Sequence, residues 1–244
     1  MPLREEMESA GHWLFRWRSY LPLVLLALVL VVVWTGPDAH ARPWYPAWLA
    51  FCLAVGVAGL VVRALTVAYV PAGTSGRQTS GQVAEDLNTG GLYSLVRHPL
   101  YVGNFLMWLG PALYPANGWL AAVVVLVFWL YYERIMFAEE EYLRRAYGQS
   151  YEQWAQQIPA FIPRLHGWKP PALPFSFRTV LRRELSSFFG LVAVFTVVEL
   201  VNNTAHRRPP LSRPWLIFFA AGLLLFLVLA FLKRRTHLLR VQGR

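Results

Sequence analysis

The residues best suited to chemistry fall in two polar clusters, each beside an apolar segment. The first cluster, LNTGGLYSLVRHPLYVGN over residues 87–104, places Arg97 and His98 directly before Pro99. Proline is favoured in the first turn of a helix, so a helix is expected to begin there with free amide groups at its start. Such a helix start can bind a carboxylate or a phosphate. The structural alternative is that Arg97 and His98 only cap the helix and anchor it at the membrane interface.

The second cluster follows the next apolar segment and contains three consecutive glutamates. Glu140 and Glu141 each have an arginine four residues later, Arg144 and Arg145. This spacing predicts two ion pairs on a solvated helix face. Glu139 has a leucine at the same spacing and no local cation. We therefore expect Glu139 to be free to bind a cationic or hydroxyl-bearing ligand.

Three other polar features lead to weaker expectations. Arg134 has no acid four residues away, so its side chain either extends to the interface or meets an anionic substrate group. Glu199, near the end of a later apolar run, is expected to be an interfacial residue. The histidines outside the first cluster lack the spacing of metal ligands, and no metal site is predicted.

The composition shows which elements must position these clusters. Of the 244 residues, 56% are hydrophobic and only 15% are charged, with a mean hydropathy of +0.38. Soluble domains carry roughly 25% charged residues, so an all-α, polytopic integral membrane protein is expected. Apolar runs long enough to cross a bilayer predict about six transmembrane helices, over residues 21–34, 44–65, 101–114, 119–137, 186–201 and 215–232.

The distribution of charge predicts the orientation. The net charge is +10, and 21 of the 23 basic residues are arginine. With six spans and both termini in the cytosol, the outer loops hold only four basic residues, which agrees with the positive-inside rule. The first span is expected to stay uncleaved, although Ala39-His40-Ala41 after it resembles a leader-peptide cleavage site. The basic surface fits an anionic lipid face, and no nucleic-acid partner is expected.

The turn PANG at residues 115–118 predicts that the third and fourth spans form a helical hairpin. This hairpin would bring the two polar clusters to the same side of the membrane. We divide the chain into two N-terminal membrane helices (1–70), a core with the clusters (71–170), and two C-terminal helices with a basic tail (171–244).

Both clusters match the signatures of a known family. Residues 90–103, GGLYSLVRHPLYVG, resemble the G-x-Y…RHP-x-Y-x-G signature of isoprenylcysteine carboxyl methyltransferases and related phospholipid methyltransferases. The later Glu139-Glu140-x-x-Leu143, Tyr147-Gly148-x-x-Tyr151 and the proline-bounded residues 158–163 resemble the second signature of that family. Order and spacing agree over about residues 78–165, and two blocks separated by a hairpin are more specific than one RHP tripeptide.

The resemblance implies a membrane methyltransferase that uses S-adenosyl-L-methionine in a cytosolic pocket around the hairpin of helices 3 and 4. An arginine- and alanine-rich composition favours a bacterial protein, and hence the inner (cytoplasmic) membrane. Arg134 and Arg97 would be the catalytic residues, orienting the acceptor. The implied cofactor contacts are Gln78, Leu87, Asn88, Tyr93, His98, Pro99, Leu100, Tyr101, Glu139 and Glu140.

The acceptor stays open at this point. A lipid or lipid-like substrate is expected, with an anionic oxygen (phosphate or carboxylate) favoured because it needs no general base, or with a headgroup amine. The last two helices could form walls for its apolar tail. Two other functions remain: a membrane reductase that uses NADPH, and a non-catalytic membrane protein with a residual pocket.

Overall fold

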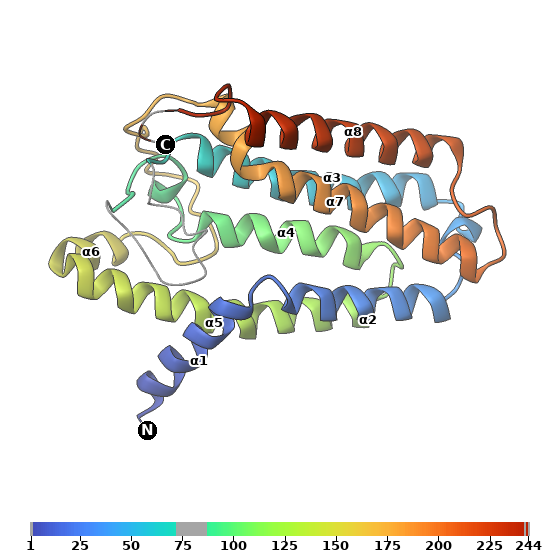
Figure 1. Cartoon of the computed structure of the whole chain (residues 1–244). Coiled ribbons are helices and arrows are strands. Elements are labelled where there is room, and N and C mark those ends of the chain that lie inside the picture. The colour runs from blue at the N-terminus through green and yellow to red at the C-terminus, as the bar shows by residue number, and fades with distance from the viewer. Residues whose placement is uncertain (1, 72–86, 242, 244) are drawn as a thin grey trace.

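The computed structural model describes residues 2–71, 87–241 and 243, and the described part is all-helical, which confirms the expected fold class (Figure 1). The helices are α1 (Leu3–Trp17), α2 (Leu21–Thr35), α3 (Tyr45–Ala68), α4 (Pro99–Leu113), α5 (Gly118–Tyr147), α6 (Gln149–Ala155), α7 (Phe177–Ala205) and α8 (Arg213–Arg235). Two short 3-10 turns complete the described elements, η1 (Ala39–Ala41) and η2 (Gly91–Ser94).

In the described part of the chain, fewer helices than the six expected are long and apolar enough to count as membrane spans. Within the described residues, α3, α5, α7 and α8 are long and apolar enough to cross a bilayer by themselves. The pair α1 and α2, bent by 70° at the break between them, could form a fifth span. α4 has only 15 residues, or about 22 Å of helix at 1.5 Å per residue, so six is an approximate count.

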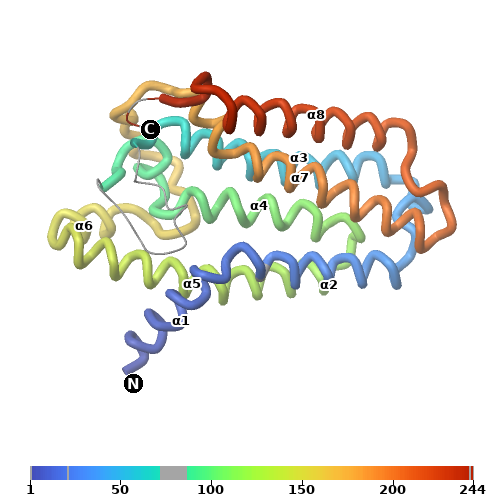
Figure 2. The backbone as a smooth tube through the Cα atoms, in the orientation of Figure 1, coloured from blue at the N-terminus to red at the C-terminus, as the bar shows by residue number. Residues whose placement is uncertain are grey.

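The apolar helices nevertheless alternate in direction through the whole bundle. Figure 2 shows α2, α3, α4, α5, α7 and α8 running back and forth along one axis, with both chain termini near the same end. The start of α4 and the end of α5 also lie at this end, with α6 beside them. We call it the cluster end, because both polar clusters lie there.

Local sequence signals explain how the central hairpin forms. Pro99 occupies the first turn of α4, where its missing N–H group costs nothing. The turn after α4 places Ala116 at a positive φ of 50°. The Asn117 side chain then accepts a hydrogen bond from the Leu120 amide at 3.0 Å and caps α5. The predicted hairpin is therefore present.

Close packing of α3 against α4 fixes the position of the hairpin in the bundle. A Cβ atom at Gly59 would lie 2.5 Å from the Gly103 carbonyl oxygen and 2.7 Å from the Met107 amide nitrogen. A Cβ atom at Gly110 would lie 2.8 Å from the Cys52 carbonyl oxygen. Small residues at such interfaces let two membrane helices approach backbone to backbone.

We expect Gly59→Val to lower the unfolding temperature of the protein in detergent, because the new side chain forces α3 and α4 apart. Overpacking of this kind costs about 1–3 kcal/mol. The matched control is Gly190→Ala in α7, where a Cβ atom meets no other atom within 4 Å. Equal unfolding temperatures for the two variants would contradict the close approach.

A second polar network closes the opposite end of the bundle. Glu199 in α7, expected at the membrane interface, is 1% exposed and therefore buried inside the bundle. Its carboxylate accepts hydrogen bonds from the hydroxyls of Tyr45 at 2.8 Å and Tyr114 at 2.6 Å, and from the Asn203 amide at 3.1 Å. The His40 Nε2 atom lies 2.9 Å from the same carboxylate. Four donors compensate the burial of this acid, and they join α3, α4 and α7.

Candidate functional site

The two polar clusters meet where α4 begins and α5 ends. His98 precedes the first turn of α4 and is buried, and its Nε2 atom lies 2.9 Å from an oxygen of Glu140. Its other ring nitrogen, Nδ1, lies 3.5 Å from Glu139. The antiparallel hairpin produces this meeting because the start of one helix faces the end of the next. The structure therefore brings together His98, Glu139 and Glu140.

The backbone before α4 is held by a later loop. The amides of Arg97 and His98 donate to the carbonyls of Pro159 at 2.9 Å and Ala160 at 3.1 Å. Further along the same loop, the Arg164 amide donates to the Leu95 carbonyl at 3.1 Å. These bonds satisfy backbone groups that a buried turn would otherwise leave unpaired. They also explain why the proline-bounded segment accompanies the first cluster in the sequence.

Glu139 and Glu140 differ in how fully their oxygens are used. Glu140 receives His98 at 2.9 Å and Arg97 Nε at 3.3 Å, and the buried Tyr151 lies close enough to interact electrostatically. Glu139 has the longer contact to His98, lies near enough to Tyr101 to interact electrostatically, and has a side chain that is 28% exposed. Glu139 thus keeps free acceptor capacity, while Glu140 positions the imidazole.

The predicted ion pairs within α5 are wrong. Glu140 turns toward His98 instead of Arg144, and the buried Glu141 pairs with Arg144 three residues later and with Arg4 of α1. Arg145 pairs with Glu8, also in α1. The N-terminal helix packs along the end of α5, and its charged side chains replace the local partners. Tertiary contacts of this kind are invisible to a spacing rule.

Aromatic rings continue the site from the cluster into the bundle. The ring of Tyr101 stacks on His98 with centroids 5.6 Å apart and lies 4.9 Å from the ring of Tyr132. Burial raises the pKa of the Tyr93 hydroxyl, and the nearby charge of Glu139 adds to the effect. Both tyrosines named in the first signature therefore lie beside Glu139.

For the other predicted cofactor contacts that lie within the described residues, the structure shows how far each residue is buried. Pro99 is fully buried in the first turn of α4, and Leu100 next to it is partly buried. Leu87 and Asn88 are partly buried in the segment leading to η2. Gln78 lies outside the residues that the structure describes.

The two predicted catalytic arginines lie in different surroundings. Arg97 belongs to the cluster through its contact with Glu140, and its guanidinium also donates to the Ala155 carbonyl at 3.5 Å. Arg134 donates to the Leu130 carbonyl of its own helix at 2.9 Å, and its backbone packs against Gly11 of α1. The structure brings Arg97, and not Arg134, into contact with the His98 cluster.

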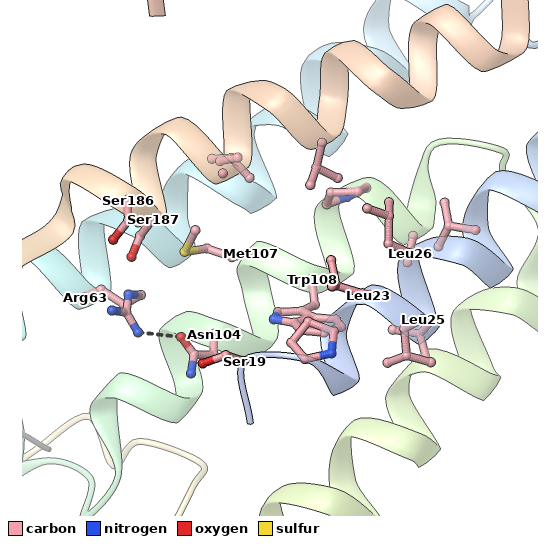
Figure 3. A pocket seen from close by; sticks show the side chains of 18 residues that line it. Ser19, Leu23, Leu25, Leu26, Arg63, Asn104, Met107, Trp108, Ser186 and Ser187 are labelled. Carbon is pink, nitrogen blue, oxygen red and sulfur yellow. Dashed lines mark hydrogen bonds between the residues drawn. The ribbon is translucent and has the colours of Figure 1, made fainter. Parts of the chain in front are cut away.

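A cavity of about 460 Å³ lies beside the cluster, between α2, α4 and α7 (Figure 3). Its polar residues gather at one end and its apolar residues at the other, as Figure 3 shows. The polar lining residues are Ser19, Arg63, Asn104, Ser186 and Ser187. Asn104 is in the second turn of α4, so the polar end faces the cluster end of the bundle. The size falls within the usual range for ligand pockets, about 300–1,000 Å³.

Hydrogen bonds and ring contacts connect the cavity to the cluster. The Asn104 amide donates to the Tyr132 hydroxyl at 3.1 Å, and Tyr132 in turn contacts Tyr101, which stacks on His98. Arg63 at the polar end was missed from the sequence. The available signal was its position inside a long apolar run, because a charge within a membrane helix is expensive and usually functional.

The surroundings of His98 favour its protonated form. Burial by itself lowers the pKa of His98, but hydrogen bonds to Glu139 and Glu140 outweigh burial and raise the pKa above its ordinary value of 6.5. A folded-state pKa above the unfolded value gives stability that is fully present below about pH 6.5 and is lost as the pH rises through the raised pKa. A protonated imidazole with a carboxylate on each side is suited to binding and orientation.

We expect the unfolding temperature in nanodiscs to fall as the pH rises above about 6.5, since the unfolded chain then releases the His98 proton while the folded protein still binds it. His98→Gln should flatten this part of the profile. His237→Gln, at an exposed position of the tail, should keep the wild-type profile. The same pH dependence in wild type and His98→Gln would show that another group titrates.

Comparison with known proteins places this site in a class. Residues 47–150 match the family described as Phospholipid methyltransferase. The chain is 30% identical over 196 residues to the nickel-cobalt-cadmium resistance protein NccN of Alcaligenes xylosoxydans xylosoxydans, covering 79% of this chain and 85% of that protein. It is 31% identical over 201 residues to the cobalt-zinc-cadmium resistance protein CzcN of Cupriavidus metallidurans, covering 81% and 86%.

A third relative carries an enzyme name. The protein-S-isoprenylcysteine O-methyltransferase of Schizosaccharomyces pombe is 39% identical over 77 residues, 32% of this chain and 33% of that protein. No solved structure gives a significant match. The chain belongs to the isoprenylcysteine carboxyl methyltransferase and phospholipid methyltransferase family of membrane proteins. Across the described residues, no group of three or more His, Cys, Asp or Glu side chains could hold a metal ion.

Proposed function

We propose that the protein transfers a methyl group from S-adenosyl-L-methionine to a lipid-like acceptor at the cluster end of the bundle. The observation that carries this proposal is the position of a partly exposed carboxylate, Glu139, 3.5 Å from the imidazole of His98, on which the ring of Tyr101 stacks. Membership of a methyltransferase family supports it. The orientation predicted from charge would place this end, and both termini, at the cytosolic face of a bacterial inner membrane.

The chemistry of the cluster fits the proposed cofactor. S-adenosyl-L-methionine carries an ammonium group, ribose hydroxyls and a carboxylate. Glu139 has acceptor capacity for the ammonium or the hydroxyls, and His98 can donate to an anionic group while Glu140 keeps the ring in place. Tyr101 and Tyr93, both partly buried, supply aromatic surface next to the cluster.

When bound, the cofactor supplies an electrophilic methyl group on a sulfonium, and methyl transfer from it is an in-line displacement. The chain therefore has to hold and orient the reactants, which contributes about 7–11 kcal/mol in favourable cases. His98 and Glu139 provide charges that are fixed before the reaction, and the surrounding tyrosines exclude water. Asn104 and Tyr132 connect this region to the cavity, which is the proposed chamber for the acceptor.

The proposed function is tested with the full-length protein in nanodiscs. Calorimetry should show binding of S-adenosyl-L-methionine, and membranes incubated with methyl-labelled cofactor should yield labelled lipid by mass spectrometry. Preferential binding of NADPH would instead support a membrane reductase. Cofactor binding with no labelled product in any membrane extract would favour a non-catalytic protein with a residual pocket.

Arg134 gives a separate prediction, because its guanidinium lies apart from the cluster. If it orients the acceptor, Arg134→Ala should abolish turnover and leave the affinity for S-adenosyl-L-methionine unchanged. Turnover and binding are measured on the same preparation. Arg145→Ala is the control. It also removes an arginine of α5, but one whose side chain pairs with Glu8 of α1, so it reports the effect of weakening the contact between α1 and α5. Parallel loss of binding and turnover would make Arg134 structural.

A further inference from the structure

The polar end of the cavity contains an ion pair with matched charges. Arg63 in α3 donates from Nε and Nη2 to the two carboxylate oxygens of Glu184 in α7, at 2.7 and 2.9 Å. Its third nitrogen, Nη1, donates to the side-chain oxygen of Asn104 in α4. Glu184 is 4% exposed. All donor nitrogens of the Arg63 guanidinium are therefore directed at partners within the protein.

The charges of Arg63 and Glu184 balance each other within the pair. Arg63 is the one charged residue among the described residues that line the cavity, and the buried Glu184 neutralises it. An anionic headgroup would have to displace Glu184 from Arg63 and break the two hydrogen bonds that join a buried carboxylate to a guanidinium, which is unfavourable. The other polar groups at this end, Ser186, Ser187 and Asn104, are neutral donors and acceptors.

We propose that this cavity binds an amphiphile with one apolar chain and an uncharged hydroxyl or thiol headgroup, held at the Arg63–Glu184–Asn104 end. This inference rests on the proposed function insofar as the bound amphiphile is the methyl acceptor. It replaces the anionic oxygen expected from the sequence because such an acceptor needs no general base. Methylation of such a headgroup forms one new sulfur–carbon or oxygen–carbon bond, breaks the S–CH₃ bond of the donor and releases the headgroup proton to water.

The test uses photoactivatable probes that share one C12 diazirine chain and differ only in the headgroup, a hydroxyl or a permanently charged sulfonate. Full-length protein in nanodiscs is labelled, and the modified residues are identified by mass spectrometry. We expect the hydroxyl probe to label the cavity, at residues such as Met107 and Trp108, about tenfold more than the sulfonate probe. Excess 1-dodecanethiol should compete, and dodecyl sulfonate should not.

A charge variant makes the test specific. Glu184→Gln leaves Arg63 without its carboxylate partner, so labelling by the sulfonate probe should rise about tenfold. Glu152→Gln, an exposed acid on α6, should keep the wild-type preference. If Glu184→Gln does not fold, the ratio measured for the wild type decides alone.

The outcomes separate this inference from the proposed function. Equal labelling by both probes, a preference for sulfonate, or labelling confined to residues outside the cavity overturns the inference. Calorimetry of S-adenosyl-L-methionine on the same nanodiscs reports on the proposed function independently. Cofactor binding without selective labelling overturns the inference alone. Selective labelling without cofactor binding overturns the proposed function and supports the preference of the cavity for an uncharged headgroup.

Discussion

Glu139→Ala is expected to weaken binding of S-adenosyl-L-methionine at least about tenfold, or about 1.4 kcal/mol. Glu139 is partly exposed and only loosely engaged by His98 at 3.5 Å, so its removal takes away a group that faces a ligand. The loss appears in calorimetric affinity. The unfolding temperature should fall less than in Glu140→Ala, because Glu139 makes the longer contact to His98.

Glu140→Ala, at the neighbouring position, is the matched variant. It separates an effect on cofactor affinity from an effect on the stability of the cluster. Glu140 holds His98 and Arg97, and its loss takes their common carboxylate from the buried His98 and the partly buried Arg97. This variant should lower the unfolding temperature as well as the affinity. Glu152→Ala, at an exposed site on α6, should change neither. Unchanged affinity in Glu139→Ala would remove Glu139 from the cofactor site.

Arg63→Ala is expected to destabilise the protein by about 3–5 kcal/mol, since it removes the bidentate partner of the buried Glu184 carboxylate. Arg63 and Glu184 have side chains that are only 14% and 5% exposed. The pair links α3 to α7, and Asn104 extends the link to α4. Unfolding temperature in detergent measures the effect.

The double variant Arg63→Met with Glu184→Leu provides the control for this prediction. Replacing both charges by apolar groups of similar volume is often neutral or stabilising. The double variant should therefore be more stable than Arg63→Ala. If both variants are equally unstable, loss of packing at Arg63 explains the effect, and the ion pair does not.

The central hairpin and the meeting of its two polar clusters could be predicted from the sequence. Pro99 and Asn117 set local helix starts, and an antiparallel pair of helices then leaves no other place for the clusters. The role of Glu139 as the less engaged acid was also predictable, because its spacing offers no partner within the helix. Local rules were sufficient wherever the partners lie in consecutive elements.

Other features depend on helices far apart in the sequence and could not be predicted. Glu140 binds His98 rather than Arg144 because α4 supplies a stronger partner than its own helix. The pairing of Arg63 with Glu184 spans 121 residues, and nothing local selects it. The lengths of α2 and α4, 15 residues each, also made the number of spans harder to predict than the class.

The network around Glu199 has a consequence for how the bundle can move. The hydrogen bonds of Tyr45, Tyr114 and His40 hold the helix ends to one carboxylate. The helices are therefore expected to move least at this end of the bundle. If the bundle opens to admit a bulky lipid, the helices should separate most at the end that contains His98 and least at the end that contains Glu199. Amide hydrogen exchange should accordingly be slowest beside Glu199 and quicken steadily toward the start of α4.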